Sequence, residues 1–289
     1  MNTFGKKARF GLLTILFIAN FFIWSALLAE ERGGELKVAF LDIGQGDAIY
    51  IEAPNGNQIL IDGGPNKTLL SQLSELMPAY DRSIDLLIVS NPDKDHIAGF
   101  IEILKSFSVA AVIEPGTEPE TAVYKEFEKL VETEGAQKII GRRGQIIWLD
   151  KTRGVYFVIL FPDQDVSAWK TNDGSIIGKL VYGNTCVIFS GDAPQNMENY
   201  VTALDGSALH CQALKVGHHG SRTSSVVSFV GTVAPDYAII SSGKDNSYGH
   251  PHQETLDTLN RFDTKILRTD TLGTIVMSSD GNLVNFRTW

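Results

Sequence analysis

Asn91-Pro92-Asp93-Lys94-Asp95-His96 follows directly after the apolar run Ile84-Asp85-Leu86-Leu87-Ile88-Val89-Ser90. This order predicts a buried strand that ends in a turn carrying two carboxylates and an imidazole. Carboxylate oxygens and an imidazole nitrogen together suit Zn²⁺, Mn²⁺ or iron. The same turn also fits the start of a helix with Asp93 or Asp95 as its N-cap. By itself the stretch leaves both interpretations open.

The surrounding sequence alternates between strand and helix patterns. Strands are predicted at residues 36–43, 47–53, 58–61, 84–89, 109–113, 146–149, 155–161, 175–181, 185–189, 213–216, 236–241, 265–268, 274–278 and 283–286. Helices are predicted at residues 67–76, 97–107, 121–134 and 255–262, and from Pro194 onward. This alternation favours a layered α/β core.

Histidines and carboxylates gather in the loops that follow these predicted strands. Five of the six histidines fall in three such loops, namely His96, His218, His219, His250 and His252. Asp192 follows another predicted strand, although it would also suit the start of the helix at Pro194. Because open α/β sheets collect their ligands at the carboxyl ends of strands, one shared metal site accounts for all of these loops together.

Size and charge narrow the class of protein. A chain of 289 residues with 43% hydrophobic residues can bury one large core. Its net charge of −9 gives no general attraction to polyphosphate, so any contact with nucleic acid must be local or mediated by a metal. This balance disfavours a basic DNA-binding module but is compatible with a nuclease.

The N-terminal residues 1–34 form a unit separate from the domain predicted at residues 35–289. Lys6, Lys7 and Arg9 precede an uncharged apolar run at residues 10–29, which is long enough to span a bilayer with its positive flank in the cytoplasm. A cleaved signal peptide is the alternative, but Leu27 stands where signal peptidase prefers a small residue. We expect a transmembrane helix in the bacterial cytoplasmic membrane and an extracytoplasmic domain, which would be exported if the signal were cleaved.

Cys186 and Cys211 are the only cysteines, and both fall in strand-like segments. An exported location would permit a disulfide, while two buried free thiols are an equally good reading. The absence of a Cys-x-x-Cys pattern excludes zinc-finger and thioredoxin-type sites.

Six short motifs together resemble the metallo-β-lactamase superfamily, and more narrowly the hydrolase domain of the ComEC/Rec2 DNA-internalisation proteins. They are Asp42-Ile43-Gly44-Gln45-Gly46-Asp47-Ala48, Leu60-Ile61-Asp62-Gly63-Gly64, Asp93-Lys94-Asp95-His96, Gly191-Asp192-Ala193, Lys215-Val216-Gly217-His218-His219-Gly220-Ser221 and Tyr248-Gly249-His250-Pro251-His252. The resemblance covers residues 35–289. It implies a four-layer αββα sandwich with a site for one or two metals on one edge.

The resemblance also implies a set of metal ligands. Its members are Asp93, Asp95, His96, Asp192, His218 and Asn172. By correspondence, Asp93 would bind the first metal, and Asp95 with His96 would bind the second. Asp192 matches the carboxylate that bridges both metals, and His218 would complete the second site.

One position departs from the family pattern, because Asn91 stands where the family usually has a histidine. The turn that begins at Asn172 lies where another first-metal histidine is common, so Asn172 or Asp173 would contribute an oxygen instead. With Asp93, the first site would consist almost entirely of oxygen ligands. Such a site favours Mn²⁺ or Mg²⁺ over Zn²⁺, or stays weak or empty. The implied cofactors are therefore one or two divalent ions of Mn, Mg or Zn.

Hydrolysis by a metal-bound hydroxide is the chemistry that the resemblance implies. Asp95 would orient the hydroxide, while His219 and His250 would bind the oxyanion or protonate the leaving group. Lys215 and Ser221, together with His250, are candidate contacts to a substrate phosphate. A surface lysine and a helix-capping serine are the alternative readings of the first two.

The function expected from the resemblance is a membrane-anchored phosphodiesterase or nuclease that acts on DNA during uptake. Full-length ComEC proteins join this domain to a multi-helix channel, whereas this sequence has one hydrophobic span, so a competence-type membrane channel would be a separate partner. A hydrolase of small esters, lactones or phosphorylated envelope components is the alternative among enzymes. A catalytically weakened binding domain is the non-enzymatic alternative, for which Asn91 is the main argument.

Overall fold

A computed structural model of the protein describes residues 3–31 and 34–289. Its helices are α1 (Thr3–Glu31), α2 (Thr68–Leu76), α3 (Lys94–Ser106), α4 (Ala122–Glu134), α5 (Gln195–Asp205), α6 (Val227–Val233), α7 (Gln253–Arg261) and α8 (Thr269–Leu272). Its strands are β1 (Leu36–Phe40), β2 (Ala48–Glu52), β3 (Gln58–Gly63), β4 (Ser83–Ile88), β5 (Ser108–Glu114), β6 (Gln137–Ile140), β7 (Ile146–Asp150), β8 (Val155–Phe161), β9 (Ile177–Tyr182), β10 (Thr185–Phe189), β11 (Ala213–Lys215), β12 (Tyr237–Ile240), β13 (Lys265–Arg268), β14 (Ile275–Ser279) and β15 (Val284–Thr288). Short 3-10 helices lie at η1 (Asn172–Gly174), η2 (Gly206–Leu209) and η3 (Gly217–Gly220).

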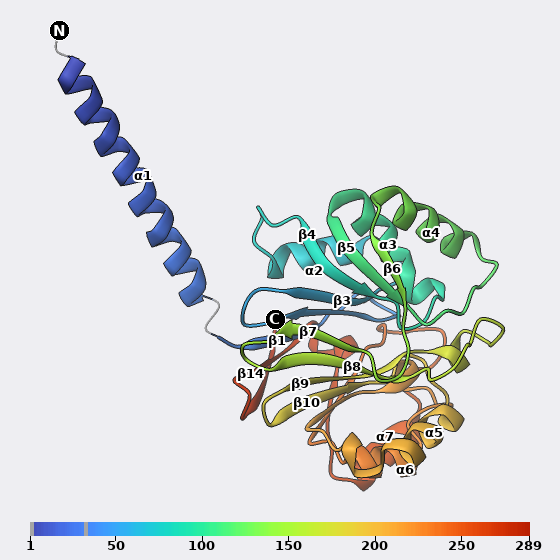
Figure 1. The fold of residues 1–289 in the computed structure, drawn as a ribbon. Helices are drawn as coiled ribbons and strands as arrows, with labels where there is room; N and C mark the ends of the chain where they lie inside the picture. The colour runs from blue at the N-terminus through green and yellow to red at the C-terminus, as the bar shows by residue number, and fades with distance from the viewer. Residues whose placement is uncertain (1–2, 32–33) are drawn as a thin grey trace.

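The strands form two sheets that pack against each other (Figure 1). The first has the order β15-β14-β1-β2-β3-β4-β5-β6 and the second the order β13-β12-β11-β10-β9-β8-β7. Strands β3 to β6 run parallel, and so do strands β10 to β13. Helices α2, α3 and α4 lie on the outer side of the first sheet, and α5, α6 and α7 on the outer side of the second (Figure 1). The predicted α/β fold of two sheets between helical layers is confirmed.

Side chains that alternate along the strands form three hydrophobic cores. One lies between the two sheets, and one lies between each sheet and its helices. In β1, Val38 and Phe40 point between the two sheets, while Ala39 points toward the helices of the first sheet. Phe40 lies against Phe189 of the opposite sheet, with ring centroids 6.4 Å apart. Strands covered on both faces are apolar at nearly every position, which explains why the sequence shows continuous apolar runs instead of a polar and apolar alternation.

The parallel strands bring the polar loops to one edge. The loop after β4 carries the acidic turn, the loop after β10 carries Asp192, and η3 follows β11. Nε2 of His96, in the first turn of α3, lies 3.1 Å from Oδ2 of Asp192, which belongs to the other sheet. The expected convergence of strand-end loops is therefore present, and it joins the two halves of the chain.

Several elements differ from the sequence-based prediction. Helix α3 begins at Lys94 instead of residue 97, and the segment before β9 forms η1. Strand β6 and helix α8 were not predicted at all. β6 is an edge strand of four residues that is mostly exposed, so it lacks the apolar run that marks the buried strands.

The N-terminal helix expected from the apolar run is present as α1. Its side chains from residue 9 to residue 24 are exposed. Within residues 3–31 and 34–289, no helix has the length and the apolarity together that a membrane crossing needs. The transmembrane span predicted from the sequence is therefore not shown.

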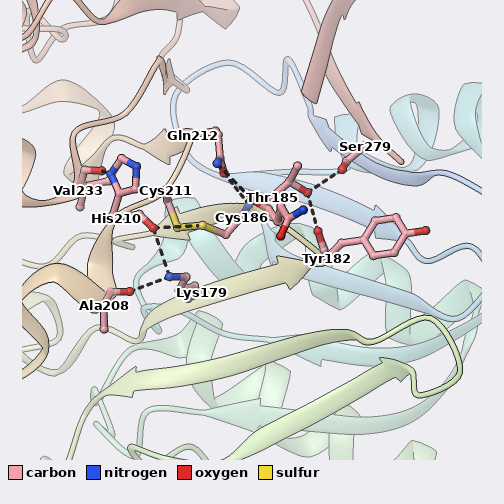
Figure 2. The surroundings of a disulfide bond; sticks show 11 residues. Lys179, Tyr182, Thr185, Cys186, Ala208, His210, Cys211, Gln212, Val233 and Ser279 are labelled. Atoms are coloured by element: carbon pink, nitrogen blue, oxygen red, sulfur yellow. Dashed lines mark hydrogen bonds between the residues drawn. A yellow bond between two sulfur atoms is a disulfide. The ribbon is translucent and has the colours of Figure 1, made fainter. Parts of the chain in front are cut away.

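Cys186 and Cys211 form a disulfide, which decides between the two readings of these residues (Figure 2). Their Cα atoms are 5.2 Å apart, and the bridge joins the start of β10 to the residues before β11. The neighbouring Gln212 accepts a hydrogen bond from the Cys186 N–H at 2.9 Å. The bridge thus ties together two adjacent strands at the ends opposite to those that carry Asp192 and η3.

Candidate metal centre

His96 is fully buried in the first turn of α3 and is held on both sides of its ring. Nδ1 lies 2.9 Å from Oδ2 of Asp62, whose carboxylate also accepts hydrogen bonds from the N–H and hydroxyl of Ser90 at 2.7 Å and 2.5 Å. Nε2 faces Asp192. A carboxylate on one ring nitrogen fixes the orientation of the imidazole and leaves the other nitrogen for a metal.

Close packing of α3 on β3 sets this geometry. A Cβ atom at Gly99 would lie 1.9 Å from the carbonyl oxygen of Gly63, so only glycine lets the helix approach this far. The start of α3 is packed as closely against the turn before β2. A Cβ atom at Gly46 in that turn would lie 2.2 Å from the carbonyl oxygen of Asp95. The two glycines therefore let the acidic turn settle between β3 and the turn before β2.

His219 comes from the second half of the chain and faces the same point. Its Nδ1 lies 3.2 Å from the carbonyl oxygen of Ser241 and 3.4 Å from Oδ1 of Asp47. Its Nε2 lies 3.4 Å from Oδ2 of Asp95 and 3.7 Å from Oδ1 of Asp192. The rings of His96 and His219 are 5.3 Å apart.

Both histidines of the pair in η3 reach Asp192, because the backbone has positive φ at His218 (49°) and His219 (55°). Nε2 of His218 lies 3.7 Å from Oδ2 of Asp192, and its Nδ1 lies 3.1 Å from Oγ1 of Thr223. His219 is buried, whereas the side chain of His218 is 26% exposed. The structure thus places His219, which the sequence assigned to catalysis, beside Asp95 and His96. His218, assigned to the second metal, lies nearer the opening.

Buried polar atoms without a hydrogen-bond partner provide a test of whether a metal fits. Among the described residues these atoms include His96 Nε2, His219 Nε2 and Asp192 Oδ1. One ligand atom each of Asp95, His96 and His219 lies within 4.8 Å of the others, as do atoms of Asp47, Asp192 and His219. A buried polar atom left unpaired costs about 1–3 kcal/mol, so convergence of several such atoms needs a shared partner. Each of these two groups combines imidazole nitrogen with carboxylate oxygen, a donor set that fits a divalent cation.

The protonation states of the cluster support this fit. Burial would lower the pKa of His219, but Asp192 and Asp47 raise it to about 9. Burial would likewise raise the pKa of Asp192, but His96 and His219 hold it well below its usual value. The carboxylates thus bind positive charge, and in the metal-free protein the imidazoles supply it. A cation would replace those protons.

The residues proposed for the first metal are already joined to one another. Asn91 Nδ2 donates to Asn172 Oδ1 at 2.7 Å, and Asn91 Oδ1 accepts from the Asp93 N–H at 3.0 Å. Asp93 Oδ2 accepts a hydrogen bond from the Thr171 hydroxyl at 3.0 Å. Asp93 occupies the N-cap position of α3 but makes no capping hydrogen bond with its side chain, so the simple cap reading fails. Its assignment and that of Asn172 to a first metal stay predictions.

Lys215 and Ser221 are placed differently from the expectation that they contact phosphate. Lys215 is buried, and its Nζ donates to Asp47 Oδ2 at 2.8 Å and to the Val216 carbonyl oxygen at 3.0 Å. Ser221 is also buried, with its hydroxyl 3.0 Å from that of Thr223. Because both polar groups are enclosed and paired, they support His219 and His218 from behind instead of facing a substrate.

A cavity of 180 Å³ opens over the cluster. It is lined by Gln45, Asp93, Asp95, Asn172, Asp192, His218, His219, Tyr248 and His250. His250 Nδ1 lies 3.4 Å from Gln45 Nε2, and burial together with the nearby His219 and His218 lowers the pKa of His250 to about 4. The predicted role of His250 at the substrate is compatible with this position.

Sequence reasoning gave no role to four residues of the centre. Asp62 and Asp47 support the histidines from behind, and Gln45 and Tyr248 line the cavity. All four stand within motifs that were quoted for the family resemblance. A signal for them was therefore present, but their partners lie too far away in the sequence to be identified from spacing.

Comparison with known proteins gives the class of this fold and site. Residues 41–244 match the sequence profile of the metallo-beta-lactamase superfamily, and the chain belongs to this family. Its fold resembles CmlA, a diiron beta-hydroxylase from Streptomyces venezuelae, with 12% identity, a TM-score of 0.53, and coverage of 88% of this chain and 54% of that one. It also resembles a long form RNase Z from yeast, with 12% identity, a TM-score of 0.50, and coverage of 82% and 41%. At this identity the likeness concerns the fold alone.

Curated relatives from bacteria carry names that refer to competence or recombination. The chain is 31% identical to ComE operon protein 3 of Bacillus subtilis, over 91% of this chain and 34% of that protein. It is 29% identical to the competence protein ComA of Neisseria gonorrhoeae, over 90% and 34%. It is 31% identical to recombination protein 2 of Haemophilus influenzae, over 93% and 32%. The chain therefore spans about a third of the length of the curated relatives it matches, and the narrower resemblance predicted from the motifs is confirmed.

Proposed function

We propose that the protein is a metal-dependent phosphodiesterase that cleaves DNA strands outside the cytoplasm. The observation that carries the metal-dependent part is that ligand atoms of Asp95, His96 and His219 lie within 4.8 Å of one another, while the buried Nε2 atoms of His96 and His219 face carboxylate oxygens of Asp192 and Asp95 at 3.1 Å and 3.4 Å. The names of the relatives, which refer to competence and recombination, support DNA as the substrate.

Asp95, His96, Asp192 and His219 would hold the cation. A divalent cation in such a site lowers the pKa of water and stabilises negative charge that develops on a phosphoryl group. Two imidazoles beside two carboxylates favour Zn²⁺ or Mn²⁺ over Mg²⁺ at this position. A first position around Asp93 would instead suit Mn²⁺ or Mg²⁺, because its neighbours offer oxygen atoms.

The chain itself sets the protons of the two imidazoles. The Asp62 carboxylate already accepts two hydrogen bonds from Ser90 and faces Nδ1 of His96, so this nitrogen would carry the ring proton and leave the lone pair of Nε2 for the cluster. The carbonyl oxygen of Ser241 does the same for His219. Both rings therefore face the cluster in the state that binds a metal.

His250 would contact the substrate at the cavity wall. Because its pKa lies near 4, the ring is neutral at neutral pH and gives a hydrogen bond without a positive charge. The side-chain amide of Gln45 lies against Nδ1, so the N–H of His250 is on Nε2. The Nε2–H of His250 would donate a hydrogen bond to a non-bridging oxygen of the phosphodiester. This bond would fix the orientation of the phosphodiester.

Metal analysis and turnover test this proposal together. Purified protein is assayed on single-stranded DNA and on bis(p-nitrophenyl) phosphate with Mn²⁺, Mg²⁺ or Zn²⁺, and its bound metal is measured. We expect turnover of both substrates and loss of metal in Asp192→Ala. No turnover with any metal, together with unchanged metal content in Asp192→Ala, rejects the proposal.

Two alternatives keep specific support. The net charge of −9 and the small cavity suit a small ester, lactone or phosphorylated envelope component, and turnover of the small diester without DNA cleavage would favour that class. Asn91, with its amide committed to Asn172, supports a catalytically weakened binding domain. Bound metal without turnover of any substrate would favour this second alternative.

The extracytoplasmic location is supported by the disulfide, since such bridges persist in oxidising compartments. The membrane anchor and a competence-type membrane channel as partner stay predictions from the sequence. Trapping of free thiols in intact bacterial cells tests the location, and carbonate extraction of membranes tests the anchor. A reduced cysteine pair in the cell would contradict the proposed compartment.

A further inference from the structure

Tyr248 stands at the rim of the cavity with most of its side chain open to solvent. It is 64% exposed, yet it lines the same cavity as Asp95 and Asp192. Packing in the core therefore gives no reason for an aromatic residue at this position. Other aromatic side chains of residues 34–289 with similar exposure, such as Tyr80 and Trp289, do not line this cavity.

The ring of Tyr248 extends an aromatic surface that leads to the metal centre. It lies nearly parallel to the ring of His250, with an interplanar angle of 22° and centroids 5.6 Å apart. His250 in turn lies 5.7 Å from His218 and 6.2 Å from His219. A flat group placed on Tyr248 would therefore be adjacent to a phosphoryl group at the cluster.

Asn246 holds this loop in one conformation before any substrate binds. Its Oδ1 accepts hydrogen bonds from the backbone N–H groups of Tyr248 and His250, at 3.1 Å and 3.0 Å. Its Nδ2 donates to the carbonyl oxygens of Gly243 and His250, at 2.9 Å and 2.6 Å. Because the backbone under Tyr248 is already ordered, binding to its ring costs little conformational entropy.

We propose that Tyr248, supported by His250, stacks on an unpaired nucleobase next to the phosphodiester at the centre, which makes single-stranded nucleic acid the preferred substrate class. This inference rests on the proposed function for the phosphodiester and adds the strand type. Unpaired bases offer a free π face, whereas bases in a duplex are covered by their neighbours. Stacking also needs no basic surface, which fits a chain of net charge −9.

The test measures stacking directly on the protein of residues 1–289. The probe is a short single strand with 2-aminopurine as its reporter base and phosphorothioate linkages that resist cleavage, and an unmodified duplex of the same sequence is the comparison. We expect the fluorescence of the strand to fall on binding to the parent protein. Tyr248→Ala should bind the strand about tenfold more weakly without this quenching, and Tyr248→Phe should behave as the parent. Tyr80→Ala, an equally exposed tyrosine on another loop, is the matched control and should also behave as the parent.

Kinetics provide the second readout. In Tyr248→Ala the ratio of kcat/KM for single-stranded DNA to kcat/KM for bis(p-nitrophenyl) phosphate should fall about tenfold, mainly through a higher KM for the strand. Parent-like affinity and quenching in Tyr248→Ala, or equal losses for single strand and duplex, would overturn the inference. Absence of turnover on both DNA and the small diester, together with unchanged metal content in Asp192→Ala, rejects the proposed function instead, and the fluorescence measurement then still decides whether Tyr248 stacks on a base.

Discussion

Lys215 and Asp47 form an ion pair inside the protein, with Nζ 2.8 Å from Oδ2 and side-chain exposures of 1% and 2%. Burial alone would raise the pKa of Asp47, but Lys215 and His219 hold it well below its usual value. The pair joins β11 to the turn before β2, so it connects the two sheets directly behind His219.

Lys215→Met should lower the free energy of unfolding by about 3–5 kcal/mol, because it leaves the charge of Asp47 buried without its partner. Urea unfolding of the metal-free protein measures this change. The double variant Asp47→Leu with Lys215→Met is the control, since it removes both charges and should recover much of the loss. A single variant as stable as the parent would show that water reaches Asp47.

Asp62→Asn should weaken metal binding by about 10- to 100-fold, because a neutral amide at this position no longer fixes the proton of His96 on Nδ1. Competition with a chelating dye measures the metal affinity. Asp81→Asn, in the loop before β4 at the strand end opposite the acidic turn, serves as the control. Unchanged affinity in Asp62→Asn would mean that His96 is oriented by Asp192 alone.

Asn91→His should raise Zn²⁺ affinity on the order of tenfold, because an imidazole would replace a neutral amide beside Asp93. Asn91 is fully buried and bonded to Asn172, so the larger ring also has to fit. Calorimetry with Zn²⁺ and a parallel unfolding curve separate these two effects. A correctly folded variant with parent-like Zn²⁺ affinity would place residue 91 outside the metal shell.

Metal-free protein should become less stable as the pH rises through about 9. The folded pKa of His219 is raised from 6.5 to about 9 by Asp192 and Asp47 against the effect of burial. A raised histidine pKa stabilises the fold fully below pH 6.5, and this contribution is lost as the folded group deprotonates. Melting temperatures in chelator across this range measure the loss, which His219→Gln should reduce. A flat profile in the parent protein would contradict the charge assigned to His219.

Reduction of the disulfide should destabilise the fold by about 3 kcal/mol, because the bridge closes a chain segment with a sequence separation of 25. Thermal unfolding with and without reductant measures this effect, and Cys186→Ala should match the reduced parent. Since the bridge lies at the strand ends opposite the metal centre, metal affinity at low temperature should change little. A large loss of metal on reduction would show that the strands transmit the change.

The sequence located the candidate metal ligands better than the residues behind them. Asp95, His96 and Asp192 lie in loops or helix starts that follow β4 and β10, so a local pattern was enough to single them out. Asp62 contacts His96 across 34 residues, and Asp47 contacts His219 across 172 residues. Local sequence patterns carry no information about contacts at such separations. Lys215 was expected either at a substrate phosphate or at the surface, and only its distant partner Asp47 explains its burial.

The different positions of His218 and His219 in the candidate site could not be predicted from the sequence either. The family resemblance assigned His218 to the second metal and His219 to the substrate. Positive φ angles at both residues turn the two rings toward Asp192. The exposed edge strand β6 was missed for a related reason, because its place in the sheet is set by β5 and not by its own pattern.

The same two φ angles show that η3 gives up backbone stability to place its two imidazoles. Left-handed backbone costs a non-glycine residue on the order of 1–2 kcal/mol, so His218 and His219 together carry strain that glycine would avoid. A loop shaped for stability alone would have glycine at both positions. The strain therefore supports a role for the two imidazoles in binding a ligand at the candidate metal centre.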